Sequence, residues 1–130
     1  MAEHRNVARM RDGYAVFAKG DLATLNDHLA EDVLWHDTGR NQLSDDYRGR
    51  EAVYGFFGKL MEITEGSLHL ELQAVFADDE HGVALVVATA SRGGRNIRVL
   101  DTHIHRLRDG MTVEFWTAST DQYAWDELIG

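Results

Sequence analysis

The sequence predicts a single α+β domain, residues 1–130, in which helices pack on one face of an antiparallel sheet. The chain has 130 residues, which is the usual size of one domain. Its first half carries apolar residues at the three- and four-residue spacing of helices, and its second half alternates apolar and polar residues as strands do. Helices followed by a run of strands are typical of the α+β class.

Three helices are expected in the first half of the chain. The first ends at Gly20, Asp21 caps the second, and the third runs from about Arg50 to a break at Glu65 and Gly66. Their apolar faces would be Val7, Met10, Tyr14 and Phe17 in the first, Leu22, Leu25 and Leu29 in the second, and Val53, Phe56, Phe57, Leu60 and Met61 in the third. These faces are expected to pack on the sheet.

Five strands are expected, one of them between the second and third helices. That strand is the β-branched and aromatic run Asp32–Asp37, and the polar stretch Thr38–Gly49 after it predicts a loop. The other four are Leu68–Phe76, Val83–Ser91, Ile97–Arg108 and Met111–Thr120. The first of these four would present Leu68, Leu70, Leu72, Ala74 and Phe76 on one face. The tail Asp121–Leu128 predicts a last helical turn.

Charge and composition exclude several classes of protein. The chain has 13 Lys and Arg against 22 Asp and Glu, and its net charge of −9 argues against nucleic acid or an anionic membrane as a partner. It has no cysteine, which excludes a disulfide scaffold, a thiol nucleophile and a cysteine-bound zinc. The longest apolar run, Val83–Ala88, is too short to span a membrane, and residues 1–11 do not resemble a signal peptide. A soluble, cytoplasmic protein is expected.

The strand Ile97–Arg108 carries the most informative chemistry. Alternate residues of a strand share a face, so Asp101, His103 and His105 lie on one face. The opposite face carries Arg98, Leu100, Thr102, Ile104, Arg106 and Arg108. If the first face points toward the helices, three titratable groups line a pocket and need partners or a task. If it points to solvent, they form an exposed polar stripe, and periodicity leaves both arrangements open.

Two further features have alternative interpretations. Asp37 ends its strand on the same face as Trp35, so it is either an acid at the rim of a pocket or a turn acid. His103 and His105 have the spacing of a metal-binding pair, but no third histidine follows them, so no metal is expected. No serine lies in a Gly-x-Ser-x-Gly elbow, so the sequence does not support a Ser-His-Asp triad.

Four phrases of the sequence resemble the nuclear-transport-factor-2-like superfamily, and within it the SnoaL-like polyketide cyclases and ketosteroid isomerases. They are Gly20-Asp21, Leu29-Ala30-Glu31-Asp32, Gly49-Arg50-Glu51 and Arg106-Leu107-Arg108-Asp109-Gly110. The resemblance covers most of the chain, from Tyr14 to Trp116. It implies a cone-shaped α+β barrel, in which three N-terminal helices close over a strongly curved antiparallel sheet and leave a deep apolar pocket. The superfamily also includes binding proteins without catalysis.

The resemblance also implies roles for individual residues. Counted from Gly20, Asp37 occupies the position of the isomerases' general base. Asp101 or His103, depending on the end from which the strand is aligned, occupies the position of the acid that hydrogen-bonds the enolate. Two positions depart from the family pattern. Tyr14 stands one residue past the isomerases' oxyanion tyrosine, and Thr117 stands where the cyclases carry a catalytic aspartate.

These residues predict a cofactor-free acid/base enzyme of the isomerase, cyclase or dehydratase type. Asp37 would remove a proton next to a carbonyl of a hydrophobic polyketide- or steroid-like molecule, and Asp101 or His103 would stabilise the enolate. His36 lies with the other strand histidines near this expected site. The predicted substrate contacts are Tyr14, Phe17, Trp35, Phe57, His105 and Trp116.

Two alternative functions and a homodimer are also predicted. The same fold could serve a non-catalytic binding protein for hydrophobic small molecules. An epoxide hydrolase-like enzyme would need an Asp-Arg-Asp arrangement, which Arg98 disfavours because it lies on the opposite face from Asp101. A homodimer is expected to form through the outer face of the sheet, which carries Leu100, Thr102 and Ile104.

Overall fold

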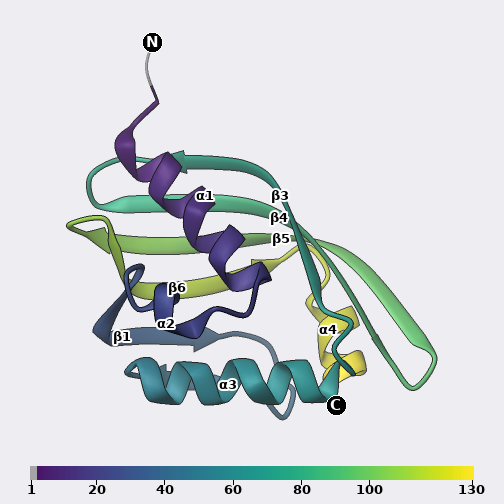
Figure 1. Cartoon of the computed structure of the whole chain (residues 1–130). Coiled ribbons are helices and arrows are strands. Elements are labelled where there is room, and N and C mark those ends of the chain that lie inside the picture. Colours follow the sequence, from purple (N-terminus) through teal and green to yellow (C-terminus); the bar gives the residue numbers. More distant parts are fainter. Residues whose placement is uncertain (1–2) are drawn as a thin grey trace.

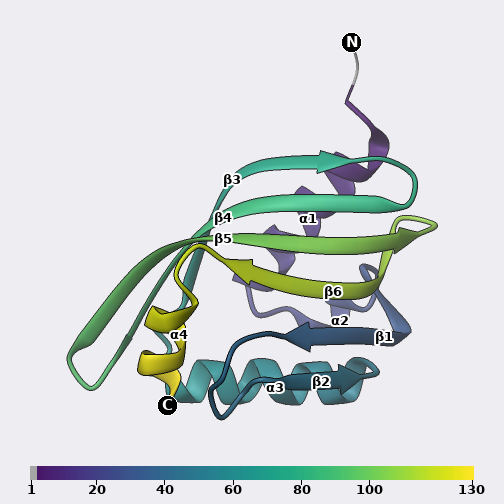
Figure 2. The ribbon, with the colours of Figure 1, turned by 180° about the vertical axis from the view of Figure 1, so that it is seen from behind.

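In the computed structural model, which describes residues 3–130, helices α1, α2 and α3 lie on one face of a single six-stranded sheet (Figure 1). The view from behind shows the strands in front of these three helices (Figure 2). The helices are α1 (Arg5–Ala18), α2 (Leu22–Leu25), α3 (Arg50–Ile63) and α4 (Gln122–Ile129). The strands are β1 (Leu29–Asp37), β2 (Asp45–Arg48), β3 (His69–Ala77), β4 (His81–Arg92), β5 (Arg95–Arg108) and β6 (Met111–Ser119). The predicted α+β class is confirmed.

The sheet is mixed, whereas the sequence predicted an antiparallel one. Its strand order is β2-β1-β6-β5-β4-β3, and every neighbouring pair is antiparallel except β1 and β6, which run parallel with Trp35 opposite Phe115. The chain leaves the sheet through α3 and returns through β3, β4 and β5 before β6 lies beside β1. Strand periodicity could not reveal this, because alternation is the same in parallel and antiparallel pairs.

The second predicted helix is much shorter than expected. Only Leu22–Leu25 is helical, and the Asp21 carboxylate caps it by accepting a hydrogen bond from the Thr24 backbone N–H. Leu29, which was expected on the apolar face of this helix, is instead the first residue of β1. Leu25 and Leu29 are both buried, so their spacing satisfied a helical pattern although the chain turns between them.

The loop after β1 and the strand β3 also differ from prediction. The stretch Thr38–Gly49 contains the short strand β2, which pairs with β1 although its residues Asp45–Arg48 are largely polar. In β3, a register shift between Leu72 and Ala74 reverses the faces of the residues that follow. Val75 is therefore buried, and Phe76 is 60% exposed.

The buried core forms two clusters on either side of a cavity. The first lies around α3 and β1 and consists of Val16, Leu25, Leu29, Val33, Leu43, Val53, Phe56, Phe57 and Ile129. The second lies under α1 and consists of Val7, Met10, Val75, Ala84, Val86 and Leu107. Residues of both clusters line the cavity. In the described part of the chain, no helix has the length and apolar character needed to cross a membrane.

The opposite face of the sheet carries a polar cluster centred on His36. The Nδ1 atom of His36 lies 2.6 Å from Asp46 Oδ1 on β2, and its Nε2 atom lies 2.7 Å from Glu114 Oε2 on β6. Burial opposes protonation of the ring, but the hydrogen bonds and charges of Glu114 and Asp46 outweigh it and raise the pKa of His36. In its protonated form, the ring therefore donates to both carboxylates and connects three strands. Leu100 and Ile104 are exposed on β5, and the homodimer expected there remains a prediction.

The His36 cluster gives a pH-dependent contribution to stability. Because the folded pKa is raised, this contribution is complete below about pH 6.5 and is lost as the pH rises through the folded pKa. We expect His36→Gln to lower the free energy of unfolding at about pH 5.5 by up to about 1 kcal/mol, since Asp46 is mostly solvent-exposed. Urea denaturation of both proteins at about pH 5.5 and 9 measures this change in the free energy of unfolding.

The matched control is His81→Gln, which alters a histidine paired with Asp78 at an exposed turn. That variant should change stability little at either pH. If His36→Gln destabilises the protein equally at both pH values, the lost contribution is packing and not charge.

Candidate active site

The titratable face of β5 points inward, toward the helices. Asp101, His103 and His105 are 5%, 7% and 7% exposed, whereas their neighbours Leu100 and Ile104 are exposed on the opposite face. This settles the choice that periodicity left open. β5 also lies between β4 and β6 in the interior of the sheet, so the alternative of an exposed polar stripe is wrong.

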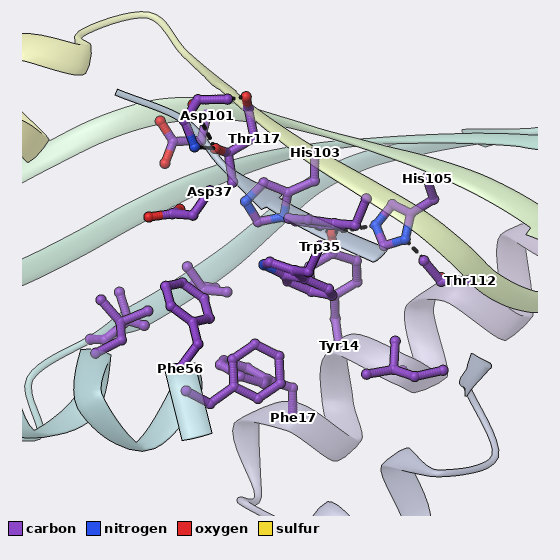
Figure 3. A pocket seen from close by; sticks show the side chains of 18 of the residues that line it. Tyr14, Phe17, Trp35, Asp37, Phe56, Asp101, His103, His105, Thr112 and Thr117 are labelled. Atoms are coloured by element: carbon purple, nitrogen blue, oxygen red, sulfur yellow. Dashed lines mark hydrogen bonds between the residues drawn. The ribbon is translucent and has the colours of Figure 1, made fainter. Parts of the chain in front are cut away.

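A cavity of about 160 Å³ lies between this face and the helices. Eight of the nine residues predicted for the site line it, namely Tyr14, Phe17, Trp35, Asp37, Phe57, Asp101, His103 and His105. Aromatic rings form much of its wall (Figure 3): Trp35 stacks on Phe115 at a centroid distance of 3.6 Å and meets Phe57 edge to face. Such a wall suits an apolar ligand.

Trp116, the ninth predicted residue, is outside the cavity. It stacks on His36 at a centroid distance of 5.2 Å, on the opposite side of the sheet. The expectation that Trp116 contacts substrate is therefore wrong, and His36 likewise lies away from the site. The cause is the alternation of β6, which places Phe115 and Thr117 in the cavity wall and turns Trp116 away.

Asp37 presents a carboxyl group to the cavity at the end of β1 (Figure 3). Its side chain has no hydrogen-bond partner within residues 3–130, so it does not act as a turn or cap acid there. Burial raises the pKa of Asp37 to about 7, and the nearby charges of Asp126 and Asp101 add to the shift. The carboxylate and the carboxylic acid are therefore both populated near neutral pH, as a proton-transfer group requires.

Asp101 is more enclosed than Asp37. Its Oδ2 atom accepts a hydrogen bond of 3.0 Å from the indole N–H of Trp125. Its Oδ1 atom is fully enclosed and has no partner among the described residues. Burial raises the pKa of Asp101, and the polar side chains of Ser119 and Trp125 beside it partly offset this effect. A ligand therefore has little direct access to this carboxyl group.

His103 and His105 belong to a buried hydrogen-bonded chain. Tyr14 Oη lies 2.7 Å from His103 Nδ1 and 3.0 Å from His105 Nε2. His105 Nδ1 in turn lies 2.9 Å from Thr112 Oγ1. Burial lowers the pKa of His103 to about 4, and burial together with His103 lowers that of His105 to about 3, so both rings are neutral at pH 7. Burial also raises the pKa of Tyr14, which remains a hydroxyl.

One imidazole nitrogen of this hydrogen-bonded chain has no hydrogen-bond partner among the described residues. His103 Nε2 has no hydrogen-bond partner among residues 3–130. In that part of the chain, Asp101 Oδ1 is the single fully enclosed side-chain nitrogen or oxygen that lacks a partner, so His103 Nε2 is not fully enclosed. In Figure 3 this nitrogen faces the side on which Asp37 and Asp101 lie. The end of the chain is thus open to a ligand beside Asp37.

Helix α4 closes one end of the cavity, a role that the predicted helical turn did not suggest. Gln122, Trp125 and Ile129 line the cavity, and Trp125 holds Asp101. Asp126 Oδ1 accepts hydrogen bonds from the Arg40 backbone N–H and from the side chains of Asn41 and Gln122, which fixes the loop after β1. The apolar spacing of Trp125, Leu128 and Ile129 is the sequence signal that could have revealed a helix with a buried face.

Three other arrangements that the sequence raised are not found among the described residues. Thr117, which stands where the cyclases carry an aspartate, shares a hydrogen bond of 2.8 Å with Thr38. Arg98 is exposed on the outer face, so it does not form an Asp-Arg-Asp arrangement with Asp37 and Asp101. Within residues 3–130, no three His, Asp or Glu side chains are grouped so that they could hold a metal ion.

Comparison with known proteins gives a consistent picture. Residues 10–115 match the profile of the SnoaL-like domain family. The chain is 29% identical to an uncharacterized protein of Mycobacterium tuberculosis over 96 residues, 73% of each chain. It is similar to Bal32a from a soil-derived mobile gene cassette, with 32% identity, a TM-score of 0.91 and 96% of each chain covered. It also resembles IdmH of Streptomyces antibioticus, a candidate polyketide cyclase, with 23% identity, a TM-score of 0.77, and 96% and 99% coverage.

Proposed function

The chain belongs to the SnoaL-like domain family, and we propose that it removes a proton next to the carbonyl of an apolar cyclic ketone, using only its own carboxyl and imidazole groups. The observation that carries this proposal is Asp37. Its carboxyl group, which has no hydrogen-bond partner among residues 3–130, has a pKa of about 7 and lies in the wall of an aromatic cavity. Burial strengthens a carboxylate as a base toward carbon acids, because the charged form loses its hydration.

The proposed reaction has two steps at neighbouring groups. The Asp37 carboxylate takes the α-proton, which leaves its electron pair in an enolate and converts Asp37 to the acid. The hydrogen-bond donor at His103 Nε2 stabilises the developing charge on the enolate oxygen. Asp37 then returns the proton to another carbon, which gives an isomer. Alternatively, the enolate carbon attacks a second carbonyl of the same molecule, and Asp37 gives its proton to the resulting alkoxide, which gives a ring that carries a hydroxyl group.

The geometry favours His103 over Asp101 as the group that holds the enolate oxygen. His103 Nε2 is open to the cavity, whereas Asp101 has one oxygen bound to Trp125 and the other fully enclosed. Asp101 instead acts on Asp37 through its charge, which contributes to the raised pKa of Asp37. The likeness to IdmH, a candidate polyketide cyclase, supports a polyketide-like substrate class.

The reaction can be tested with a simple ketone before the natural substrate is known. We expect the protein to accelerate exchange of the C1 protons of 2-tetralone for deuterium in D₂O, with a rate that saturates as the ketone concentration rises. Loss of the proton signal by ¹H NMR, compared with buffer at the same pH, measures the exchange. Saturable binding without acceleration would identify the alternative, a non-catalytic binding protein, which the largely apolar cavity could also serve.

A further inference from the structure

The hydrogen-bonded chain behind His103 can run in two directions. It joins Thr112 Oγ1, His105, Tyr14 Oη and His103 in that order, through contacts of 2.9, 3.0 and 2.7 Å. A neutral imidazole carries one N–H and one acceptor nitrogen, and a tyrosine hydroxyl donates one hydrogen bond. Tyr14 Oη has no other partner among residues 3–130, so its buried hydrogen finds an acceptor only if it donates to one histidine while it accepts from the other. The direction of one link then fixes the others. The two directions give His103 opposite tautomers.

The two directions present different chemistry to the cavity. If Thr112 donates to His105, then His105 donates to Tyr14, Tyr14 donates to His103 Nδ1, and the proton of His103 is on Nε2. If the chain runs the other way, His103 donates from Nδ1 and Nε2 becomes an acceptor. Only the first direction offers a donor to an enolate oxygen, so the mechanism depends on which one the protein adopts.

The hydroxyl of Thr112 determines the direction. Thr112 is buried, and its Oγ1 atom contacts His105 alone among the hydrogen bonds of residues 3–130. In the reverse direction this hydroxyl would accept from His105, and its own hydrogen would be buried without an acceptor, which carries the full penalty of desolvation. In the forward direction every buried donor of the chain is satisfied. The single unpaired donor is then His103 Nε2–H, which faces the cavity where a ligand can accept it.

We infer that Thr112 is a positioning residue, which fixes the tautomers of His105 and His103 so that the cavity presents a hydrogen-bond donor beside Asp37. This inference rests on the proposed function for its catalytic meaning, although the tautomers themselves do not depend on activity. It also narrows the ligand class. The group that meets His103 must be an acceptor oxygen, such as a carbonyl or enolate, and an ammonium group would leave Nε2–H unpaired.

The test compares Thr112→Val, which removes the hydroxyl and keeps the β-branched shape, with Thr112→Ser, which keeps the hydroxyl. Long-range ¹H–¹⁵N NMR of the full-length labelled protein reports which nitrogen of each histidine is protonated. In the wild type we expect His103 to be protonated on Nε2 and unprotonated on Nδ1. Thr112→Ser should keep this pattern, and Thr112→Val should give mixed tautomers for His103 and His105.

Two NMR results would overturn the inference: a wild-type His103 protonated on Nδ1, or tautomers that Thr112→Val leaves unchanged. Ketone exchange supplies a second reading. Thr112→Val should lower kcat about tenfold with little change in KM, and Thr112→Ser should recover most of the rate. If the wild type exchanges no ketone but shows the expected tautomers, the proposed function fails and the assignment of Thr112 stands.

Discussion

Replacing Asp37 with asparagine is expected to lower the rate of ketone exchange by a factor of about 10²–10⁴, the usual contribution of a general base. Asparagine has nearly the same shape but cannot accept the α-proton at neutral pH. The cavity wall and the free His103 Nε2 remain, so Asp37→Asn should still bind the ketone. Exchange by ¹H NMR and binding by calorimetry measure the two effects separately.

Asp37→Asn should also stabilise the fold at alkaline pH. The pKa of Asp37 is about 7 in the folded protein and about 3.9 in the unfolded chain, so the folded state holds its proton more tightly. The wild type therefore loses stability as the pH rises from about 4 to 7, and the loss is complete above that range. At about pH 8 we expect the free energy of unfolding of Asp37→Asn to exceed that of the wild type by roughly 1–3 kcal/mol.

The control for both measurements is Asp32→Asn, which alters an exposed carboxylate on the same strand. It should change neither exchange nor the pH dependence of stability. Wild-type exchange in Asp37→Asn would remove Asp37 as the base. A lower stability of that variant at about pH 8 would show that a partner holds the ionised carboxylate in solution.

Replacing His103 with phenylalanine is expected to have the second large effect on ketone exchange. Phenylalanine fills a similar volume but offers no N–H at the open end of the chain. We expect kcat for ketone exchange to fall by a factor of about 10²–10³, as for the loss of one donor to a developing oxyanion. The substitution also removes the partner of Tyr14 at His103 Nδ1, so a cooperative thermal unfolding transition is needed to show that the variant is folded.

Asp101→Asn provides the matched comparison, since asparagine can still accept the Trp125 hydrogen bond. Asp101 raises the pKa of Asp37 through its charge, so this variant should move the acid limb of the pH–rate profile to lower pH. Its rate at about pH 8 should stay within about tenfold of wild type. If Asp101→Asn loses more activity than His103→Phe, Asp101 holds the enolate oxygen.

The titratable side chains of the site could be predicted from the sequence, but their surroundings could not. Alternation placed Asp101, His103 and His105 on one face of a strand, and the family resemblance added Asp37 from a distant strand. The inward direction of that face depends on the neighbouring strands and on the helices that cover it, which are long-range contacts. Trp116 was misplaced because its hydrophobicity suggested the interior, whereas His36 covers it on the other side.

The remaining errors also have local physical causes. The register shift in β3 adds one residue to the strand, and no residue type marks it before Phe76 turns outward. β2 is polar because it lies at the edge of the sheet, where its pairing with β1 compensates for weak β propensity. The links from Tyr14 to His103 and His105 and from Trp125 to Asp101 join residues that are distant in sequence, so spacing could not reveal them.

The cavity between the two core clusters makes stability a measure of binding. A ligand that fills it binds the folded protein and not the unfolded chain, so it raises the melting temperature by an amount that grows with the logarithm of its concentration relative to Kd. At a concentration of 100 times Kd the gain is about 2.7 kcal/mol, which in a domain of this size corresponds to a shift of several degrees. A thermal-shift screen of neutral cyclic ketones, with Asp37→Asn alongside the wild type, can therefore lead to the natural substrate without any knowledge of the product.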